Sequence, residues 1–174
     1  MNQSLFLTIN GWAGHRVWLD ALMYFCAEYL MYVMILAVVV YVIIDYKRWR
    51  DMAIVSVGSA LVARFVVASG IRMFYYHARP YWVLAQTHML ITPEKTSSFP
   101  SGHTIFVFSL AMAVYQYNKK VGNWFFLAAI LVGFSRIFAG AHWPYDIVAG
   151  AVLGVLTAIV CVWGFKKYVI KAVR

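Results

Sequence analysis

The chain is short of charge: 12% of its 174 residues are Asp, Glu, Lys or Arg, and 64% are hydrophobic. A soluble domain carries roughly 25% charged residues, so this deficit argues against a soluble protein and indicates an integral membrane protein. A spanning helix needs about 20 apolar residues, and about five or six such helices fill the chain. We therefore predict a single membrane-embedded domain over residues 1–174.

Cysteine and acidic residues are also scarce. The two cysteines, Cys26 and Cys161, both fall inside apolar runs, which excludes a disulfide framework and indicates packing roles. The six Asp and Glu residues form no cluster able to hold a metal ion, so we expect neither a metal nor a cofactor. The N-terminus lacks a basic region followed by a cleavage site, and we expect no signal peptide.

Basic residues are in excess, with a formal charge of +9, but their positions argue against a nucleic-acid partner. Most lie just beyond the ends of apolar runs, which is typical of cytoplasmic loop ends in membrane proteins. Three clusters hold nine of the fifteen basic residues: Lys47, Arg48, Arg50; Lys119, Lys120; and Lys166, Lys167, Lys171, Arg174.

Five apolar segments predict an all-α bundle of five transmembrane helices, over residues 19–44, 52–75, 102–117, 124–140 and 145–165. Apolar residues at helical spacing from Leu5 to Ala13 add a short N-terminal helix at the membrane surface; the alternative is a sixth, truncated span. With five spans the three basic clusters share one side, which the positive-inside rule makes cytoplasmic. We therefore expect a multi-pass protein of a bacterial-type plasma membrane with a cytoplasmic C-terminus.

Three polar motifs fall on the opposite, outer side of this topology. They are "RMFYYHARP" with Arg72 and Arg79, "PSGH" from Pro100 to His103, and "SRIFAGAHWPYD" with Arg136, His142 and Asp146. Although long apolar segments separate them in sequence, the topology brings them to one membrane face. Such a concentration of polar groups predicts a functional site.

The residue types in these motifs indicate phosphate chemistry. Three arginines supply forks that match phosphate oxygens. Ser101 is placed to cap a helix beginning at Gly102, whose free N–H groups bind anions, and Gly102 permits close approach of a ligand. His142 and Asp146 are four positions apart, which suits a nucleophile and the group that orients it, and His103 is left as a general acid.

The three motifs resemble those of the type 2 phosphatidic acid phosphatase (PAP2) superfamily: K-x6-R-P, P-S-G-H and S-R-x5-H-x3-D. The sequence matches the second and third completely and has Arg72 where lysine is usual in the first. The resemblance implies a metal-independent lipid phosphatase. His142 would form a phosphohistidine, Asp146 would orient it, and His103 would protonate the leaving group. Phosphate would be held by Arg72, Arg79, Ser101, Gly102 and Arg136.

The small size and outward site further resemble bacterial undecaprenyl-diphosphate phosphatases of the bacitracin-resistance type, although their second motif usually reads P-S-D-H. The implied partner is a membrane lipid, either a polyprenyl diphosphate or a phospholipid phosphate such as phosphatidylglycerophosphate or phosphatidate. Two rival classes remain. A vanadium haloperoxidase has a similar constellation but is soluble and far larger. A phospholipid- or anion-binding or transport protein would keep the arginines without needing both histidines.

We also predict roles for four charged residues that lie outside the motifs. The loop over residues 76–100 is expected to guide the lipid head group, with Glu94 and Lys95 near the entrance. Glu28 and Arg64 lie inside apolar segments at similar depth, about 12 Å below the outer face at 1.5 Å per residue, so we predict a buried ion pair supporting the pocket. The alternative makes Arg64 a further phosphate ligand or turns it toward a water-filled cavity, with Glu28 polarising a site histidine.

Two further patterns have plain structural interpretations. Gly150 and Gly154, four residues apart, are expected to let their helix pack closely inside the bundle; a dimer face is the alternative. His15, His77 and His88 are interpreted as polar tips at the membrane interface.

Overall fold

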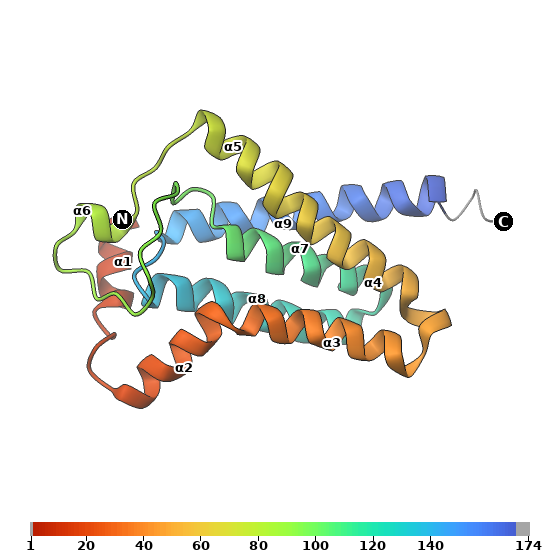
Figure 1. Cartoon of the computed structure of the whole chain (residues 1–174), viewed down its shortest axis with the longest axis horizontal. Helices are drawn as coiled ribbons and strands as arrows, with labels where there is room; N and C mark the ends of the chain where they lie inside the picture. Colours follow the sequence, from red (N-terminus) through yellow and green to blue (C-terminus); the bar gives the residue numbers. More distant parts are fainter. Residues whose placement is uncertain (1, 170–174) are drawn as a thin grey trace.

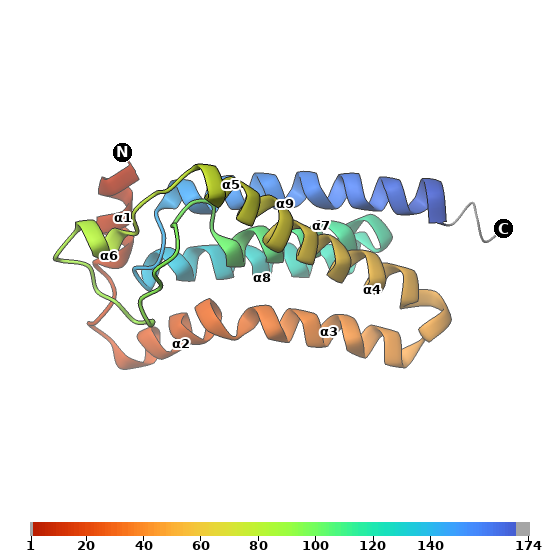
Figure 2. The same ribbon diagram turned by 45° about the horizontal axis from the view of Figure 1, so that its top comes forward.

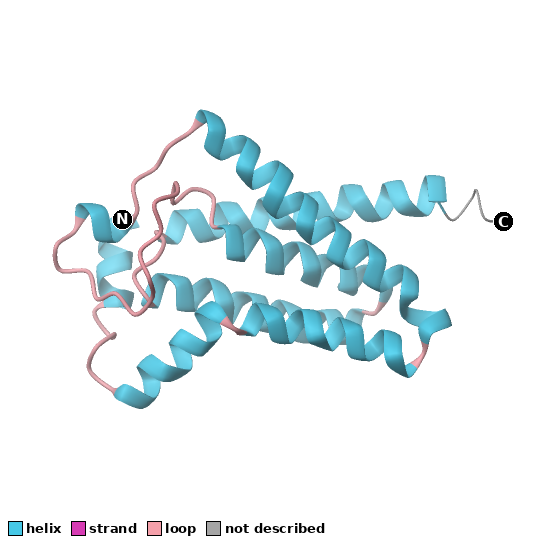
Figure 3. Cartoon of the chain, in the orientation of Figure 1, coloured by secondary structure: helices cyan, strands magenta, loops and turns pink. Residues whose placement is uncertain are grey.

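The computed structural model describes residues 2–169 of the chain, and within that range all of its regular elements are helices, with no strand (Figure 3). The residues Lys171 and Arg174 of the third basic cluster lie outside the described part. In chain order the elements are α1 (Asn2–Asn10), α2 (Val17–Glu28), α3 (Leu30–Ile44), α4 (Tyr46–Leu61), the π-helix η1 (Val62–Ala68), α5 (Ser69–Phe74), α6 (Pro80–Val83), α7 (Gly102–Tyr117), α8 (Lys119–Phe138), α9 (Pro144–Gly164) and the π-helix η2 (Phe165–Val169).

Each of the five predicted apolar segments is helical. Three continuous helices are long and apolar enough to cross a membrane: Tyr46–Phe74, which combines α4, η1 and α5, then α8, and then Pro144–Tyr168. The first segment is broken between α2 and α3 and bent by 55°, and it makes a fourth candidate if the two halves form one span. The remaining segment, α7, has 16 residues.

Helix α7 lies at the centre of the bundle, packed against α4, α8 and α9 (Figure 1). Its core side chains, from Ile105 through Leu110 to Val114, are fully buried. The surrounding helices instead expose large apolar side chains on their outer faces, such as Leu36 at 61% and Val160 at 65% exposure. A soluble protein rarely exposes extended apolar surface, so this exterior fits a lipid environment.

The bundle has two chemically different ends (Figures 1 and 2). The turn between α3 and α4, the turn between α7 and α8, and the end of η2 gather at one end, and they carry the basic residues 47–50, 119–120 and 166–167. The opposite end holds α1, α6, the 75–101 connection and the turn before α9. The three polar motifs therefore lie together, as the topology predicted.

The N-terminal helix α1 is fastened to this second end. Phe6 is fully buried against Trp143, with ring centroids 5.2 Å apart. The side-chain amide of Asn10 donates hydrogen bonds to the carbonyl oxygens of His88 and Phe138, each at 2.8 Å. Helix α1 thus braces the loop and the end of α8 against each other. Its placement at the membrane surface stays a prediction.

Close packing of α9 on α7 depends on two glycines. A Cβ added at Gly154 would lie 2.4 Å from the Ile105 carbonyl oxygen, and one at Gly150 would lie 3.1 Å from the Ser101 carbonyl oxygen. Both glycines thus face α7, so the interpretation of close packing inside the bundle is confirmed. The contact at Gly150 also sets the distance from α9 to the start of α7.

Gly154→Ala should therefore lower the stability of the protein. The added methyl group meets backbone rather than a flexible side chain, and such overpacking costs about 1–3 kcal/mol. Gly164→Ala in the same helix is the matched control, because its Cβ would meet no described atom within 4 Å. Thermal unfolding in detergent should show a lower Tm for Gly154→Ala alone. Equal Tm values for the two variants would contradict the packing.

Candidate active site

His142 lies in the turn between α8 and α9, where it is 1% exposed, and its Nδ1 faces Asp146 and Ser98. The direct distance from Nδ1 to Asp146 Oδ2 is 3.6 Å, which is too long for a hydrogen bond. The hydroxyl of Ser98 bridges the gap: it donates to Asp146 Oδ2 and lies 3.3 Å from Nδ1. Because the only hydroxyl proton goes to the carboxylate, Nδ1–H is the donor to Ser98.

This chain of hydrogen bonds fixes the tautomer of His142. With the proton on Nδ1, Nε2 carries the free lone pair. Asp146 is held in turn by the Trp143 backbone N–H, which donates to Oδ2 at 2.9 Å. Pro144 is the first residue of α9, so the carboxylate belongs to the first helical turn, as the sequence predicted. The predicted orientation of His142 by Asp146 operates through Ser98 in this structure.

Nε2 of His142 faces Arg79, which is 2% exposed and whose Nη1 lies 3.4 Å away. The guanidinium of Arg79 is held in place from three directions. It donates to the carbonyl oxygens of Thr96 and Ala141, to the Thr96 hydroxyl and to the Glu94 carboxylate at 2.7 Å. A cation is thereby fixed beside the nitrogen that carries the lone pair.

Arg136, near the C-terminal end of α8, is fully buried and contacts two carboxylates. Nη1 donates to Glu28 Oε1 at 2.6 Å, and Nη2 lies 3.3 Å from Glu94 Oε1. Its Nε is buried with no hydrogen-bond partner among the described residues. A buried donor without a partner is costly, and here it belongs to a group that was predicted to bind phosphate.

The predicted ion pair between Glu28 and Arg64 was wrong. The 55° bend at Tyr29 between α2 and α3 directs the end of α2 toward α8, so that Glu28 meets Arg136 instead. Equal depth along straight helices does not predict this partner, because the first segment breaks at Tyr29. Support of the pocket by Glu28 stays a prediction. Arg64 lies against α7 and is part of the site.

Glu94 is partly exposed, and its carboxylate bridges the guanidinium groups of Arg79 and Arg136. Lys95 is exposed. The role of both residues at an entrance stays a prediction. Burial alone would raise the pKa of Glu94, but Arg79 and Arg136 outweigh it and hold the pKa below its usual value. The bridging carboxylate demonstrates that the two arginines can share one anion.

The PSGH motif forms the start of α7, as predicted, with Ser101 immediately before the first helical residue, Gly102. The Ser101 side chain does not cap the helix, because its Oγ accepts a hydrogen bond from the Thr104 hydroxyl. Arg72 Nη2 donates to the Pro100 carbonyl oxygen at 2.7 Å, and Arg64 Nη1 donates to the Gly102 carbonyl oxygen at 3.3 Å. Both arginines therefore line the entry to this helix.

His103, in the first turn of α7, completes the cluster. It lies within electrostatic reach of Arg64, Arg79, Arg136 and His142. The motif residues Arg72, Arg79, Ser101, Gly102, His103, Arg136, His142 and Asp146 thus gather at one end of the bundle, together with Glu28, Arg64 and Glu94. Around Arg79, Arg136 and Glu94, positive charge faces the Nε2 of His142, which is an arrangement suited to a phosphoryl group.

Sequence reasoning missed three residues of the site. Ser98 bridges His142 and Asp146, the Thr96 hydroxyl holds Arg79, and His77 Nδ1 lies 3.4 Å from Asp146 Oδ1. We had interpreted His77 as a polar tip. The run "TSSFPSGH" carried a signal, since small hydroxyl residues directly before a phosphate motif are candidates for hydrogen bonding, but their partners were not evident from spacing.

Burial lowers the pKa of His142 to about 4, and the charges of Arg79 and Arg136 act in the same direction, while the Asp146 carboxylate opposes them. The imidazole is therefore neutral at physiological pH. A neutral imidazole whose Nε2 lone pair faces a fixed cation can act as a nucleophile toward an anion held by that cation.

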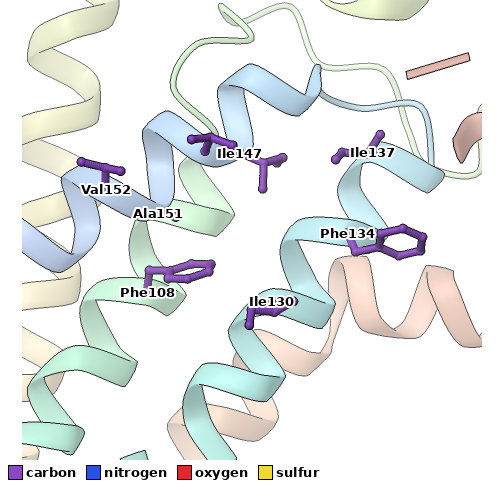
Figure 4. Close-up of a pocket in the computed structure, with 8 residues that line it drawn as sticks. Phe108, Ile130, Phe134, Ile137, Ile147, Ala151 and Val152 are labelled. Atoms are coloured by element: carbon purple, nitrogen blue, oxygen red, sulfur yellow. The ribbon is translucent and has the colours of Figure 1, made fainter. Parts of the chain in front are cut away.

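A groove of about 330 Å³ lies beside the polar cluster but has different chemistry (Figure 4). Its lining comes from α7, α8 and α9 and consists of apolar side chains: Phe108, Ile130, Phe134, Ile137, Ile147, Val148, Ala151 and Val152. Ile137 and Ile147 directly follow Arg136 and Asp146 in sequence. The same two helices thus turn polar residues toward the site and apolar residues toward this groove, which suits hydrocarbon rather than a head group.

Comparisons with known proteins identify the family and several relatives. The profile of the PAP2 superfamily matches residues 27–170. The bacitracin transport permease protein BcrC of Bacillus licheniformis is 36% identical over 96% of this chain and 82% of its own length. The undecaprenyl-diphosphatase BcrC of Bacillus subtilis is 30% identical over 90% of this chain and 80% of its own. The crystal structure of Aquifex aeolicus LpxE superposes with a TM-score of 0.76 at 28% identity, covering 92% of this chain and 94% of that one.

Glu28→Gln should destabilise the protein, because it removes a carboxylate from a guanidinium that is completely buried. Glu28 itself is 34% exposed, so we expect a loss of about 2 kcal/mol, between the values for exposed and buried pairs. Asp51→Asn, which breaks the exposed pair with Arg50, is the control and should cost under about 0.5 kcal/mol.

Double-mutant cycles on thermal unfolding identify the partner of Glu28. The double mutant Glu28→Gln with Arg136→Ala should lose less stability than the sum of the two single losses. The double mutant Glu28→Gln with Arg64→Ala should lose the sum of its two single losses. Coupling of Glu28 to Arg64 but not to Arg136 would contradict the observed pair.

Proposed function

The chain belongs to the PAP2 superfamily, and we propose that it is a multi-pass membrane lipid phosphatase that forms a phosphohistidine at His142. One observation carries the proposal. His142 is neutral, has its free Nε2 directed at Arg79, and is oriented from behind through Ser98 by Asp146. Anion binding alone requires the arginines but not an oriented nucleophile behind them.

In the proposed reaction, the phosphoryl group takes the place of the Glu94 carboxylate between Arg79 and Arg136. His142 Nε2 attacks phosphorus in line, a P–N bond forms, and the bond from phosphorus to the lipid-side oxygen breaks. His103 gives a proton to that leaving oxygen. An anion bound among the arginines favours the protonated form of His103 that this step needs.

A water molecule then completes the turnover. His103, now neutral, takes a proton from the water as its oxygen attacks phosphorus, the P–N bond breaks, and inorganic phosphate leaves with His142 regenerated. Arg79 and Arg136 stabilise the charge on the equatorial oxygens in both steps. Their burial strengthens this interaction, because few water molecules screen it.

The substrate proposed is undecaprenyl diphosphate, cleaved to undecaprenyl phosphate and inorganic phosphate for reuse of the lipid carrier in cell-wall synthesis. The name of the Bacillus subtilis relative supports this choice. The basic clusters at the opposite end support a cytoplasmic C-terminus and an active site at the outer face of the plasma membrane. The apolar exterior keeps the lipid chain in the bilayer while its head group enters the site.

A transport or anion-binding protein is the second candidate, and the name of the Bacillus licheniformis relative, a bacitracin transport permease protein, favours it. Such a protein would bind the same head group through the arginines. It would have no use for the Nδ1–H to Ser98 to Asp146 chain, which prepares a nitrogen for attack. Phosphate release therefore separates the two candidates.

We expect the protein to release phosphate from a detergent-solubilised prenyl diphosphate. His142→Ala should lower the rate of release at least 1,000-fold, which corresponds to about 4 kcal/mol of activation free energy. His88→Ala is a matched control, because His88 lies on the surface of the same end of the bundle. Phosphatidate and phosphatidylglycerophosphate, assayed in the same detergent, give kcat/KM values that rank the lipid classes. Release that persists in His142→Ala would contradict the proposal.

Activity should also persist in excess EDTA and be inhibited by vanadate. Among residues 2–169, no three carboxylate, imidazole or thiol groups are placed to hold a metal ion together, so every step is assigned to side chains. Vanadate mimics phosphate and should compete for Arg79 and Arg136. Loss of activity in EDTA that zinc or magnesium restores would contradict the metal-free mechanism.

The pH dependence of kcat/KM should reflect the lowered pKa of His142, about 4. The neutral form attacks phosphorus, so activity falls only as the pH drops through this value, where the imidazole takes up a proton. The acid limb should therefore lie well below pH 6.5, the ordinary value for histidine. An acid limb near 6.5 in the pH profile of kcat/KM would show that His142 is not held neutral by burial.

A further inference from the structure

Arg64 is a charged residue of the site that lies outside all three motifs. It belongs to η1, in the middle of the continuous helix Tyr46–Phe74. Its guanidinium is half-buried at the start of α7, with Nη1 donating to the Gly102 carbonyl oxygen at 3.3 Å. Carbonyl contact satisfies one donor but does not offset the positive charge, which within a bilayer requires an anionic partner or water.

The π-helix explains why Arg64 points at the site. In a regular α-helix, residues eight apart differ in direction by about 80°, which would turn Arg64 away from the face that carries Arg72. The wider turns of η1 reduce this angle. Both guanidinium groups consequently lie over Gly102: a Cβ there would be 3.3 Å from Arg72 Nη2 and 3.8 Å from Arg64 Cζ.

The charges around the site are unequal. Four guanidinium groups, from Arg64, Arg72, Arg79 and Arg136, face three carboxylates. Glu28 and Glu94 form ion pairs only with Arg79 or Arg136, and Asp146 is held by Ser98 and the Trp143 N–H. Within residues 2–169, no carboxylate lies within 4 Å of Arg64 or Arg72. The Nε of Arg72 is also buried without a hydrogen-bond partner in this part of the chain.

The arginines form one connected cluster. Arg79 and Arg136 lie beside His142, Arg64 and Arg72 lie over the start of α7, and Arg72 is within electrostatic reach of Arg79, Glu94, Arg64 and Asp146. His103 is within reach of Arg64, Arg79 and Arg136. His103 thus lies in the first turn of α7, within electrostatic reach of Arg79 and Arg136 beside His142 and also of Arg64 over the start of the helix.

We propose that Arg64, next to Arg72, forms a second anion subsite that binds the phosphoryl group nearer the lipid chain in a diphosphate substrate. This inference rests on the proposed function and assigns its specificity. In a diphosphate, the leaving oxygen that His103 protonates belongs to the lipid monophosphate, so a second phosphoryl group remains on the far side of His103. A lipid monophosphate releases an alcohol and offers Arg64 no anion.

The test compares farnesyl diphosphate with farnesyl phosphate, which share one lipid chain, using the full-length protein in one detergent. Arg64→Gln should lower the ratio of kcat/KM for the diphosphate to kcat/KM for the monophosphate about tenfold, and Arg64→Lys should fall between, because it keeps the charge and loses the fork. Arg50→Gln, an exposed arginine at the other end of the same helix, should leave the ratio unchanged. A ratio in Arg64→Gln within twofold of the wild type would overturn the subsite.

A binding measurement separates this inference from the proposed hydrolysis. Isothermal titration calorimetry with methylene diphosphonate and with inorganic phosphate requires no turnover. Arg64→Gln should weaken binding of the diphosphonate at least fivefold more than binding of phosphate, and equal losses would overturn the second subsite. A protein that hydrolyses neither farnesyl lipid would refute the phosphatase, while the calorimetric ratio would still decide whether Arg64 binds a second phosphoryl group.

Discussion

The burial of the Arg136 guanidinium between two carboxylates is the interaction on which the site depends. Glu28 comes from α2 and Glu94 from the connection between α6 and α7, and they meet on a side chain of α8 that is fully buried. Neither a buried guanidinium nor these carboxylates are tolerated alone in an apolar bundle. Their mutual dependence joins three separate parts of the chain at the place where Arg79, held by the same Glu94, faces His142.

The preformed cation cluster and the apolar helices have different roles in the site. The apolar helices supply a dry surround in which a few fixed charges interact strongly, and α7 presents its N-terminal turn to them. His142 is kept neutral by the same burial that strengthens the arginines. One physical condition, exclusion of water, thus both prepares the nucleophile and increases the attraction of the site for a phosphoryl group.

Much of this arrangement was predictable from the sequence. The contacts that were not predicted have physical reasons. Apolar segments and basic clusters predicted the helices and their two ends, and motif spacing predicted the convergence of Arg79, His103, Arg136, His142 and Asp146. The pairing of Glu28 with Arg136 depended on a helix break at Tyr29 that composition does not reveal. The roles of Ser98 and Glu94 depended on the path of a loop, whose conformation is set by tertiary contacts rather than by periodicity.

The central claim is that His142 becomes covalently phosphorylated. The most direct measurement is rapid acid-free denaturation of the enzyme during turnover of a prenyl diphosphate labelled with ³²P in its terminal phosphoryl group. We expect label attached to His142, stable in base and labile in acid as for a phosphoramidate, and absent from His142→Ala. Turnover of the wild type without bound label, or labelling that is unaltered in His142→Ala, would contradict it.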